Sequence, residues 1–406
     1  MEDRIAFAAI AVVAIVGIVV GAIGISIINV PTEPVDIHYG GQYYPGEFLL
    51  QGHTEFWDTY GLKIQHTLFS SGTENNEALL SGKIDINCGS DTKTIALFNA
   101  AEEGGSIEPL IIGTIQRGNR YSTVIPVDSE DTWLDLTKAK GKKVGYRTGT
   151  GADTIMRRYF ATDPDNSNLS FDDFDWQSMN VEDMPAALEA NQIDAFTAWE
   201  PTPAIAVDQG IGKLLRSYGD VALVPVSMHT TKSFAYDNPA LIVAFLAAHL
   251  DKMEMIQNQK SKAAEYAAAA ASKFGSEVTS SAFEDLYERI DYSIDFNTSI
   301  IDDILDTADF LANTIDPPLI STIPTLEYDR RFIEAALDLQ DDFPTASGIN
   351  DELSFSCKAN VIDLAIEVAA DHGLISPNHW LFEHFLKSIL QRFRDLLLDM
   401  IIIIEI

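Results

Sequence analysis

The order of apolar and polar residues predicts strands that alternate with helices over the first half of the chain. Residues 35–39 and 62–68 alternate between the two kinds of side chain, as half-buried strands do. Hydroxyl residues at 70–73 and the glycine at 82 would cap a helix between them. Strand–helix alternation predicts a parallel α/β sheet. The elements expected next are a strand at 84–87, a turn at 88–90 and a helix from residue 91.

The helix–strand unit at residues 78–85 has a second copy at residues 187–194. The first copy reads ALLSGKID and the second reads ALEANQID. In both, a residue that tolerates left-handed backbone, Gly82 or Asn191, ends a helix before an Ile-Asp pair. Helix–turn–strand units look alike in many α/β proteins, but the matching register favours a duplication.

The middle of the chain repeats the strand–loop–helix pattern, and the part beyond Val226 is expected to be helical. Alanine-rich stretches in this second part have high helix propensity. The expected elements are a strand at 142–146, a loop at 147–151 and helices at 152–160, 238–257, 261–274, 281–290 and 300–313.

The amino-terminal segment predicts a membrane anchor. Residues 5–30 are apolar, glycine or alanine except for Ser26 and Asn29. As a helix they would span roughly 39 Å, more than a hydrocarbon core of about 30 Å. We therefore expect residues 1–31 to anchor the chain in the cell membrane, and a long cleaved signal sequence is the alternative. Residues 31–34 are typical of a short, stiff linker.

Composition and charge exclude several classes of protein. The 406 residues include 61 Asp and Glu against 27 Lys and Arg, a formal net charge of −34, and no basic stripe for a nucleic acid. An apolar fraction of 46% excludes disorder as the main state. We interpret the acidic surface as a matter of solubility and habitat, because a ligand feels local groups. For Cys88 and Cys357, two unpaired thiols are a safer interpretation than one bridge.

Sequence signatures of catalysis are missing. Gly149-Thr150-Gly151 lacks the third glycine of a dinucleotide fingerprint, and neither a Gly-Lys-Ser/Thr phosphate loop nor a Gly-x-Ser-x-Gly elbow occurs. His379 and His384 are five residues apart, off the spacing that puts two metal ligands on one helix face. We therefore expect a protein that is not an enzyme and has no catalytic residue, cofactor or metal site.

Three loops place small hydroxyl residues where a helix is expected to start. Helix starts present unpaired N–H groups and partial positive charge, which together hold an anion. Each loop alone is explained by ordinary capping. Three at equivalent strand ends favour an anion site, because ligands of open α/β sheets lie outside the carboxyl ends of the strands. The candidates are Ser71, Gly89, Ser90, Asp91, Thr148, Gly149 and Thr150.

Trp199-Glu200-Pro201 follows directly after another expected strand, at residues 193–197. We expect Trp199 to stack on a ligand or form a wall of its site. Three roles stay open for Glu200: accepting a hydrogen bond from an amine, latching two lobes, or simply occupying a helix start that favours acidic residues.

With these motifs, the chain resembles the substrate-binding proteins of nitrate, sulfonate and taurine ABC importers. The matching segments are FWDTYGLKI at residues 56–64, Ser71-Gly72 through Asp85, residues 136–151 and residues 187–201. The resemblance covers about residues 36–339. Its motifs are individually degenerate, and their order and spacing make the match specific.

The resemblance implies the type 2 periplasmic binding-protein fold, with two α/β lobes that close on a ligand held between them. Lobe 1 would comprise residues 36–121 and 227–341, and lobe 2 residues 122–226. A helical extension at residues 342–406 has no counterpart in that family. Its apolar end at 380–406 is expected to pack on the body, with an interaction helix or a membrane-lying helix as the alternatives. The implied ligand contacts are Gly41, Gln42, Tyr43, Ser71, Gly89, Ser90, Asp91, Thr148, Gly149, Thr150, Trp199 and Glu200.

The implied function is the extracytoplasmic capture of a small anion, such as a sulfonate, taurine or nitrate. Its partners would be an ABC permease with cytoplasmic ATPase subunits, and the membrane through the amino-terminal helix. A thiamine-pyrimidine or riboflavin-like ligand is the alternative, for which Tyr43, Tyr44 and Trp199 would supply aromatic walls. A pyrimidine synthase of the same fold is disfavoured by the two cysteines and the apolar amino terminus. A sensor ectodomain is disfavoured because no signalling domain follows the body.

Overall fold

The computed structural model describes residues 36–129, 140–162, 169–292, 298–342 and 355–375. The predicted membrane anchor and the apolar stretch at 380–406 lie outside the described residues. Within the described ranges, every helix is too short or too polar to span a membrane.

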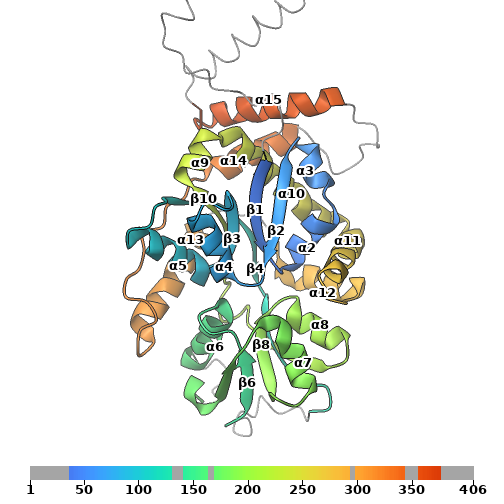
Figure 1. Cartoon of the computed structure of the whole chain (residues 1–406), viewed down its shortest axis with the longest axis vertical. Helices are drawn as coiled ribbons and strands as arrows, with labels where there is room; N and C mark the ends of the chain where they lie inside the picture. The colour runs from blue at the N-terminus through green and yellow to red at the C-terminus, as the bar shows by residue number, and fades with distance from the viewer. Residues whose placement is uncertain (1–35, 130–139, 163–168, 293–297, 343–354, 376–406) are drawn as a thin grey trace, which may run out of the picture. The chain divides into compact units, whose positions relative to one another are not determined.

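Two mixed β-sheets organise the described part of the chain (Figure 1). The first has the strand order β11-β4-β10-β3-β1-β2 and the second β7-β6-β8-β5-β9. The strands of the first sheet are β1 (Asp36–Gln42), β2 (Lys63–Phe69), β3 (Ile86–Ser90), β4 (Pro109–Gly118), β10 (Val226–Thr231) and β11 (Ile290–Asp291). Those of the second are β5 (Tyr121–Pro126), β6 (Lys143–Tyr146), β7 (Asp175–Ser178), β8 (Ala195–Trp199) and β9 (Gly212–Ser217).

The chain passes from the first sheet to the second between β4 and β5, and returns between β9 and β10. We call each sheet with its helices a lobe. β10 runs antiparallel to β3 and β4, and β5 runs antiparallel to β8 and β9. The prediction of a parallel sheet is therefore right only for the pairs that β1 and β6 make with their neighbours. Parallel neighbours are normally joined by a crossover helix, which the sequence pattern reveals. The strands β5 and β10 follow a passage from one sheet to the other, so the local pattern does not reveal their direction.

The two copies of the predicted repeat have the same local structure. Gly82 and Asn191 both adopt left-handed backbone, with φ of 68° and 53°. The Asp85 carboxylate accepts a hydrogen bond from a backbone N–H of β1, and the Asp194 carboxylate accepts one from a backbone N–H of β6, both at 2.8 Å. The repeated Ile-Asp pair thus ties the segment before β3 to β1, and the segment before β8 to β6.

Helices cover both sheets, and most lie in lobe 1 (Figure 1). The expected helices at 238–257, 261–274 and 281–290 are confirmed to within one residue at each end. The helices of lobe 1 are α2 (Pro45–Gly52), α3 (Glu55–Thr59), α4 (Gly72–Leu80), α5 (Asp91–Glu102), α9 (Lys232–Asp237), α10 (Pro239–Asn258), α11 (Lys260–Lys273), α12 (Ser280–Arg289), α13 (Thr298–Asp309), α14 (Arg331–Asp342) and α15 (Phe355–Asp371). Those of lobe 2 are α6 (Gly151–Thr162), α7 (Met184–Glu189) and α8 (Thr202–Asp208).

The turn expected at residues 88–90 is wrong, because β3 continues to Ser90. All five residues of β3 pair with β10, from Ile86 opposite Thr230 to Ser90 opposite Val226. The partner strand lies more than a hundred residues away in the sequence, so the small residues at 88–90 read locally as a turn.

The core of lobe 1 is built around α10, which is apolar on nearly all sides and packs on α14 and α15. A helix of this kind is stable only when it is covered all round. α15 lies in the predicted carboxyl-terminal extension, so this part of the extension packs on the body.

Close backbone packing between α2 and α11 yields a test of the core. A Cβ at Gly52 would lie 2.2 Å from the Tyr266 carbonyl oxygen, whereas a Cβ at Gly46 of the same helix would meet only a ring atom of Tyr292 at 3.3 Å. We expect Gly52→Ala to lower the free energy of unfolding by about 1–3 kcal/mol through overpacking. Gly46→Ala should change it by less than about 1 kcal/mol, because helix propensity offsets the contact. Equal changes in chemical denaturation would contradict this packing.

Candidate ligand-binding site

Two predicted ligand contacts, Gln42 and Ser90, lie at the carboxyl ends of β1 and β3, close to the segments that connect the two sheets. Gln42 ends β1 and is 3% exposed, and Ser90 ends β3 and is 4% exposed. The Gln42 side-chain oxygen accepts a hydrogen bond from the Tyr44 hydroxyl at 2.6 Å. Both predicted residues therefore lie inside the protein rather than on its outer surface.

Gly41 is needed for packing behind this strand end. A Cβ there would lie 2.5 Å from Nε2 of His66 and 2.7 Å from Oε2 of Glu47, two buried groups 3.0 Å apart. Tyr43 points elsewhere, because its ring packs on Phe48 and Phe274. The structure thus gives Gly41 a role in packing and places the Tyr43 ring among aromatic side chains.

Two of the predicted hydroxyl and acidic residues are bound by neighbouring groups. The Ser71 hydroxyl caps α4 by accepting from the Glu74 N–H at 3.3 Å. The Asp91 carboxylate accepts from the Thr92 N–H at 2.6 Å and from the Thr307 hydroxyl at 2.7 Å. Asp91 is therefore a link between α5 and α13, and its oxygens are largely used.

The loop before α6 reaches lobe 1. Gly149 has φ of 68°, and its N–H donates to the Asp153 carboxylate at 2.9 Å. The Gly149 carbonyl accepts from Nζ of Lys93, in α5, at 2.8 Å. The Thr150 hydroxyl donates to a carbonyl of the same loop, while Thr148 is exposed. The bond between Lys93 and Gly149 thus joins α5, which follows the loop at residues 88–91, to the loop at residues 148–151. Gly89, in the first of these loops, packs against the aliphatic part of the Lys93 side chain.

Glu200 joins the two lobes. It is 1% exposed, and its Oε1 accepts from the Ser122 hydroxyl at 2.9 Å and from Arg289, the last residue of α12, at 2.5 Å. Its Oε2 accepts from the Ala204 N–H at 3.0 Å. Of the three roles left open by the sequence, these contacts favour the latch. Trp199, at the end of β8, is 6% exposed.

Sequence reasoning missed Arg120, which lies between β4 and β5. Its guanidinium is 1% exposed, donates from Nε to the Val224 carbonyl and from Nη2 to the Tyr121 hydroxyl, both at 2.8 Å, and lies 5.4 Å from the centre of the Tyr44 ring. Its Nη1 is buried and has no hydrogen-bond partner among the described residues. The available signal was a pair of arginines, Arg117 and Arg120, between two uncharged runs, residues 109–116 and 121–127, in an acidic chain.

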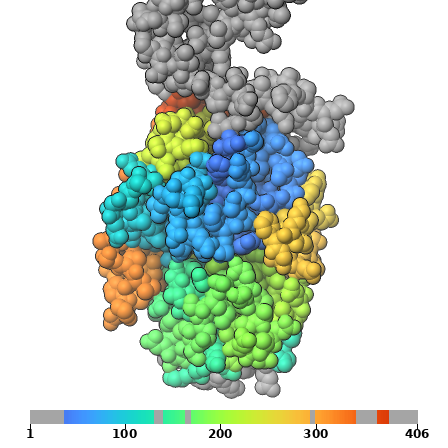
Figure 2. Space-filling model, in the orientation of Figure 1, coloured from blue at the N-terminus to red at the C-terminus, as the bar shows by residue number. Residues whose placement is uncertain are grey.

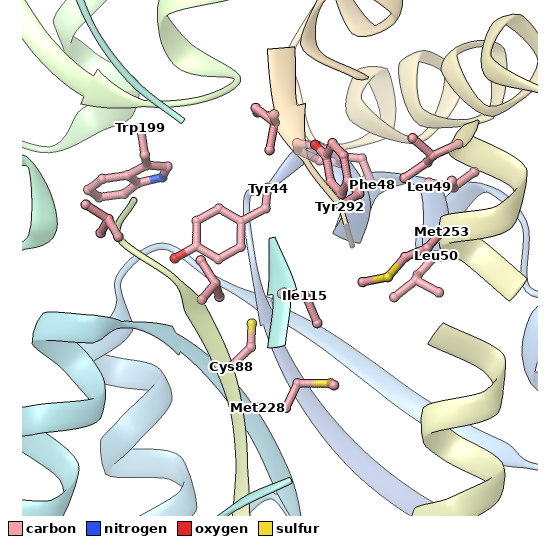
Figure 3. Packing of buried hydrophobic residues seen from close by; sticks show 14 of the residues in the cluster. Tyr44, Phe48, Leu49, Leu50, Cys88, Ile115, Trp199, Met228, Met253 and Tyr292 are labelled. Carbon is pink, nitrogen blue, oxygen red and sulfur yellow. The ribbon is translucent and has the colours of Figure 1, made fainter. Parts of the chain in front are cut away.

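Tyr121 connects Arg120 to the predicted loops. Burial raises the pKa of Tyr121, while Arg120 and a hydrogen bond with Ser90 lower it. A Cβ at Gly151, the first residue of α6, would lie 2.0 Å from the Tyr121 hydroxyl oxygen. Tyr121 also pairs with Trp199 in the ladder between β5 and β8. Figure 3 shows Tyr44 and Trp199, which belong to the same buried cluster.

Cations lie close to the predicted ligand contacts despite the acidic chain. Burial alone would lower the pKa of Arg120, but Tyr121, Tyr44 and Asp91 raise it above its ordinary value, so the guanidinium stays charged. Burial and the positive charge of Arg147 lower the pKa of Lys93. Three cations therefore lie around the strand ends and the loop at Gly149, together with the buried carboxylates of Asp91 and Asp153, which accept hydrogen bonds from the chain.

Comparison with known proteins agrees with this architecture. The chain is 23% identical over 198 residues to an Escherichia coli (strain K12) protein provisionally named aliphatic sulfonates-binding protein; the match covers 49% of this chain and 59% of that protein. The alkanesulfonate-binding protein SsuA from Xanthomonas axonopodis pv. citri, bound to MOPS, has a TM-score of 0.61 at 19% identity over 74% of this chain and 100% of SsuA. The desulfurization enzyme DSZB has a TM-score of 0.56 at 13% identity over 75% of this chain and 99% of the enzyme.

Two sheets joined by two strand crossings define the class of type 2 periplasmic binding proteins. A model of the NMT1-like family matches residues 31–272, and the chain belongs to that family. The predicted resemblance to ABC substrate-binding proteins is thereby confirmed. The chain spans 59% of the curated relative, and an enzyme shares the fold, so the site must carry the functional argument.

A buried histidine supports the Ser90 strand end and predicts a pH dependence. The neutral ring of His229 donates from Nδ1 to Oδ1 of Asn87 at 2.8 Å, and its Nε2 lies 2.9 Å from the Thr94 hydroxyl, which is 3.1 Å from the Ser90 carbonyl. Burial lowers the pKa of His229 to about 3. Because the unfolded state takes up this proton below about pH 6.5, stability falls as pH falls from about 6.5 to 3.

We expect His229→Gln to make the free energy of unfolding less dependent on pH in this window. The slope should fall by up to about 1.4 kcal/mol per pH unit. Chemical denaturation at several pH values between 4 and 7 measures it. His249, whose pKa burial also lowers, should keep part of the slope in the variant. Identical slopes in the two proteins would show that His229 is protonated in the folded state.

Proposed function

We propose that the chain is the extracytoplasmic substrate-binding component of an ABC importer, and that it captures a small sulfonate or related oxyanion between its lobes. The observation that carries the proposal is Arg120, a buried guanidinium whose Nη1 has no protein partner among the described residues. A buried, unpaired donor costs about 1–3 kcal/mol, and more when charged, so an anionic ligand would recover that energy.

The surroundings of Arg120 suit an oxyanion. The hydroxyls of Tyr121 and Ser90 are neutral donors close to the guanidinium, while the Tyr44 hydroxyl donates to Gln42. Helix α6 begins at Gly151 beside the Tyr121 hydroxyl. Guanidinium, hydroxyl and helix-start N–H groups are the donors that bind sulfonate, nitrate and phosphate in proteins. Relatives named for sulfonates support the same ligand class for this chain.

The carboxylates favour a ligand without an amine. Both predicted acidic contacts, Asp91 and Glu200, already accept hydrogen bonds from groups of the chain. A taurine ammonium would have to compete with these groups for the carboxylate oxygens. We therefore infer that a simple alkanesulfonate binds more tightly than taurine. A flat ring is less favoured, because the Arg120 guanidinium already lies over the Tyr44 ring.

A thermal-shift panel on the full chain tests the ligand class. It contains butanesulfonate, taurine, nitrate, bicarbonate, a thiamine pyrimidine and riboflavin. A ligand at about 100 times its dissociation constant adds roughly 2.7 kcal/mol, which raises the unfolding midpoint clearly. We expect butanesulfonate to give the largest shift. A shift with only a ring compound would retain the fold and overturn the anion.

Arg120→Met tests the residue. Loss of a charge-assisted pair should weaken butanesulfonate binding about a hundredfold or more, measured by calorimetry. Arg117→Met is the matched control, since Arg117 lies three residues before Arg120, near the end of β4, and bonds Asp291 at 2.7 Å. The control should bind like the parent protein. Equal affinity of the Arg120 variant and the parent would remove Arg120 from the site.

A further inference from the structure

Lobe 2 contacts lobe 1 on two flanks away from the strand crossing. On one flank, the Asp208 carboxylate of α8 accepts from the N–H and hydroxyl of Thr279 at 2.9 and 2.7 Å, at the start of α12. On the other flank, Arg158 of α6 binds α13. Figure 2 shows the segments of α12, in gold, and α13, in orange, on opposite sides of the green lobe 2.

Arg158 makes three contacts with one turn of α13. Its Nη1 donates to the Asp306 carboxylate at 2.5 Å, and its Nη2 donates to the Asp306 carbonyl at 3.2 Å and lies 3.5 Å from the Thr307 hydroxyl. The guanidinium also lies 4.8 Å from the centre of the Phe310 ring. The side chain is thus fixed by an ion pair, a carbonyl and an aromatic face.

The turn of α13 that Arg158 contacts also contacts Asp91, one of the predicted ligand contacts. Thr307 donates to the Asp91 carboxylate at 2.7 Å. Asp91 in turn acts electrostatically on Arg120, the cation of the proposed anion site. A continuous set of contacts therefore runs from lobe 2 through α13 to the residue that neighbours Arg120.

We propose that Arg158 is a positioning residue: its contact with α13 clasps the lobes together and holds Asp91, through Thr307, in the geometry that sets ligand affinity. The inference rests on the proposed function for the affinity, but not for the clasp itself. Arg158 touches no predicted ligand contact, so it acts only through α13.

The contact between Arg158 and α13 combines an ion pair, which salt screens, with a hydrogen bond to a carbonyl, which salt screens less. The Asp306 side chain is 69% exposed, so its ion pair with Arg158 weakens at high ionic strength. The bond to the Asp306 carbonyl involves a neutral acceptor and is screened less. We therefore expect part of the effect of Arg158 to remain in high salt.

Arg158→Met tests the clasp, with Arg216→Met as the matched control. Arg216 has a similar environment within lobe 2: its side chain is 18% exposed, against 11% for Arg158, and it pairs with an equally exposed carboxylate, that of Asp220. It also lies over an aromatic ring, that of Tyr159, at 5.0 Å. Both changes remove one charge and retain a long apolar stem.

The first measurement is hydrogen–deuterium exchange of the full chain without added ligand. Arg158→Met should raise the exchange of α13 and of residues 147–151 about tenfold, and Arg216→Met should leave both segments unchanged. The second is butanesulfonate affinity, which should fall about tenfold for Arg158→Met only. Thr307→Val should lower affinity about fivefold, with little further loss when combined with Arg158→Met.

The two measurements separate the clasp from the proposed function. If butanesulfonate fails to bind the parent protein, the ligand class is wrong, and the exchange of α13 still decides the clasp. If the parent binds while Arg158→Met matches Arg216→Met in exchange and affinity, the clasp is overturned and the binding function stands. Should Arg158→Met not fold, Thr307→Val alone must weaken binding for the inference to hold.

Discussion

The burial of one positive charge, that of Arg120, is the constraint on which the site and the lobe crossing both depend. Arg120 lies on the segment from β4 to β5 and donates to the carbonyl of Val224, on the segment that returns to β10. Val224 has φ of 43°, in the left-handed region that is costly for a β-branched residue, of order 1–3 kcal/mol. The same guanidinium thus fixes a strained residue on one crossing and offers Nη1 to a ligand from the other. A ligand that draws on Arg120 would act directly on the segments about which the lobes move.

The two lobes contact each other through one buried bond and through exposed bonds further out. The bond between Glu200 and Arg289 lies deep, next to the crossing, with the carboxylate wholly buried. The contacts of Asp208 with Thr279 and of Arg158 with Asp306 lie further out, each with an exposed partner. Helix α12 is held at both ends by carboxylates of lobe 2, at its start by Asp208 and at its end, through Arg289, by Glu200. A rigid α12 therefore transmits any displacement of lobe 2 from the outer contact to the inner one.

Local sequence pattern was sufficient for the parts of the fold that local bonds create. The cap at Ser71 and the left-handed Gly82 follow from nearest neighbours in the sequence, and both are found as predicted. The strands expected at 84–87 and 193–197 begin two residues later, as β3 and β8, because the Asp of each Ile-Asp pair bonds a neighbouring strand that is distant in the sequence. The latch role of Glu200 depends on Arg289, and the continuation of β3 depends on β10, both distant in the chain. The sequence does not single out Arg120, because its importance comes from a buried Nη1 without a hydrogen-bond partner among the described residues. An unpaired donor can be recognised only when the packing around it is known. For the same reason Asp91 looked like a ligand contact, although Thr307 uses one of its oxygens.

The net charge of −34 and a site for an anion are compatible because they act over different distances. At about 1 M salt the Debye length is roughly 3 Å, so distant surface carboxylates contribute little to the potential at Arg120. Within the protein, screening is weak, and Asp91 is a carboxylate that, after Tyr121 and Tyr44, raises the pKa of that arginine. In the proposed site, the position of Asp91 would thus affect anion affinity more than distant surface carboxylates do. Its position is fixed by Thr307, on a helix that lobe 2 grips through Arg158. If the proposed site binds an anion, the contacts that place this buried carboxylate tune its affinity, and the geometry of closure becomes part of the electrostatics of the site.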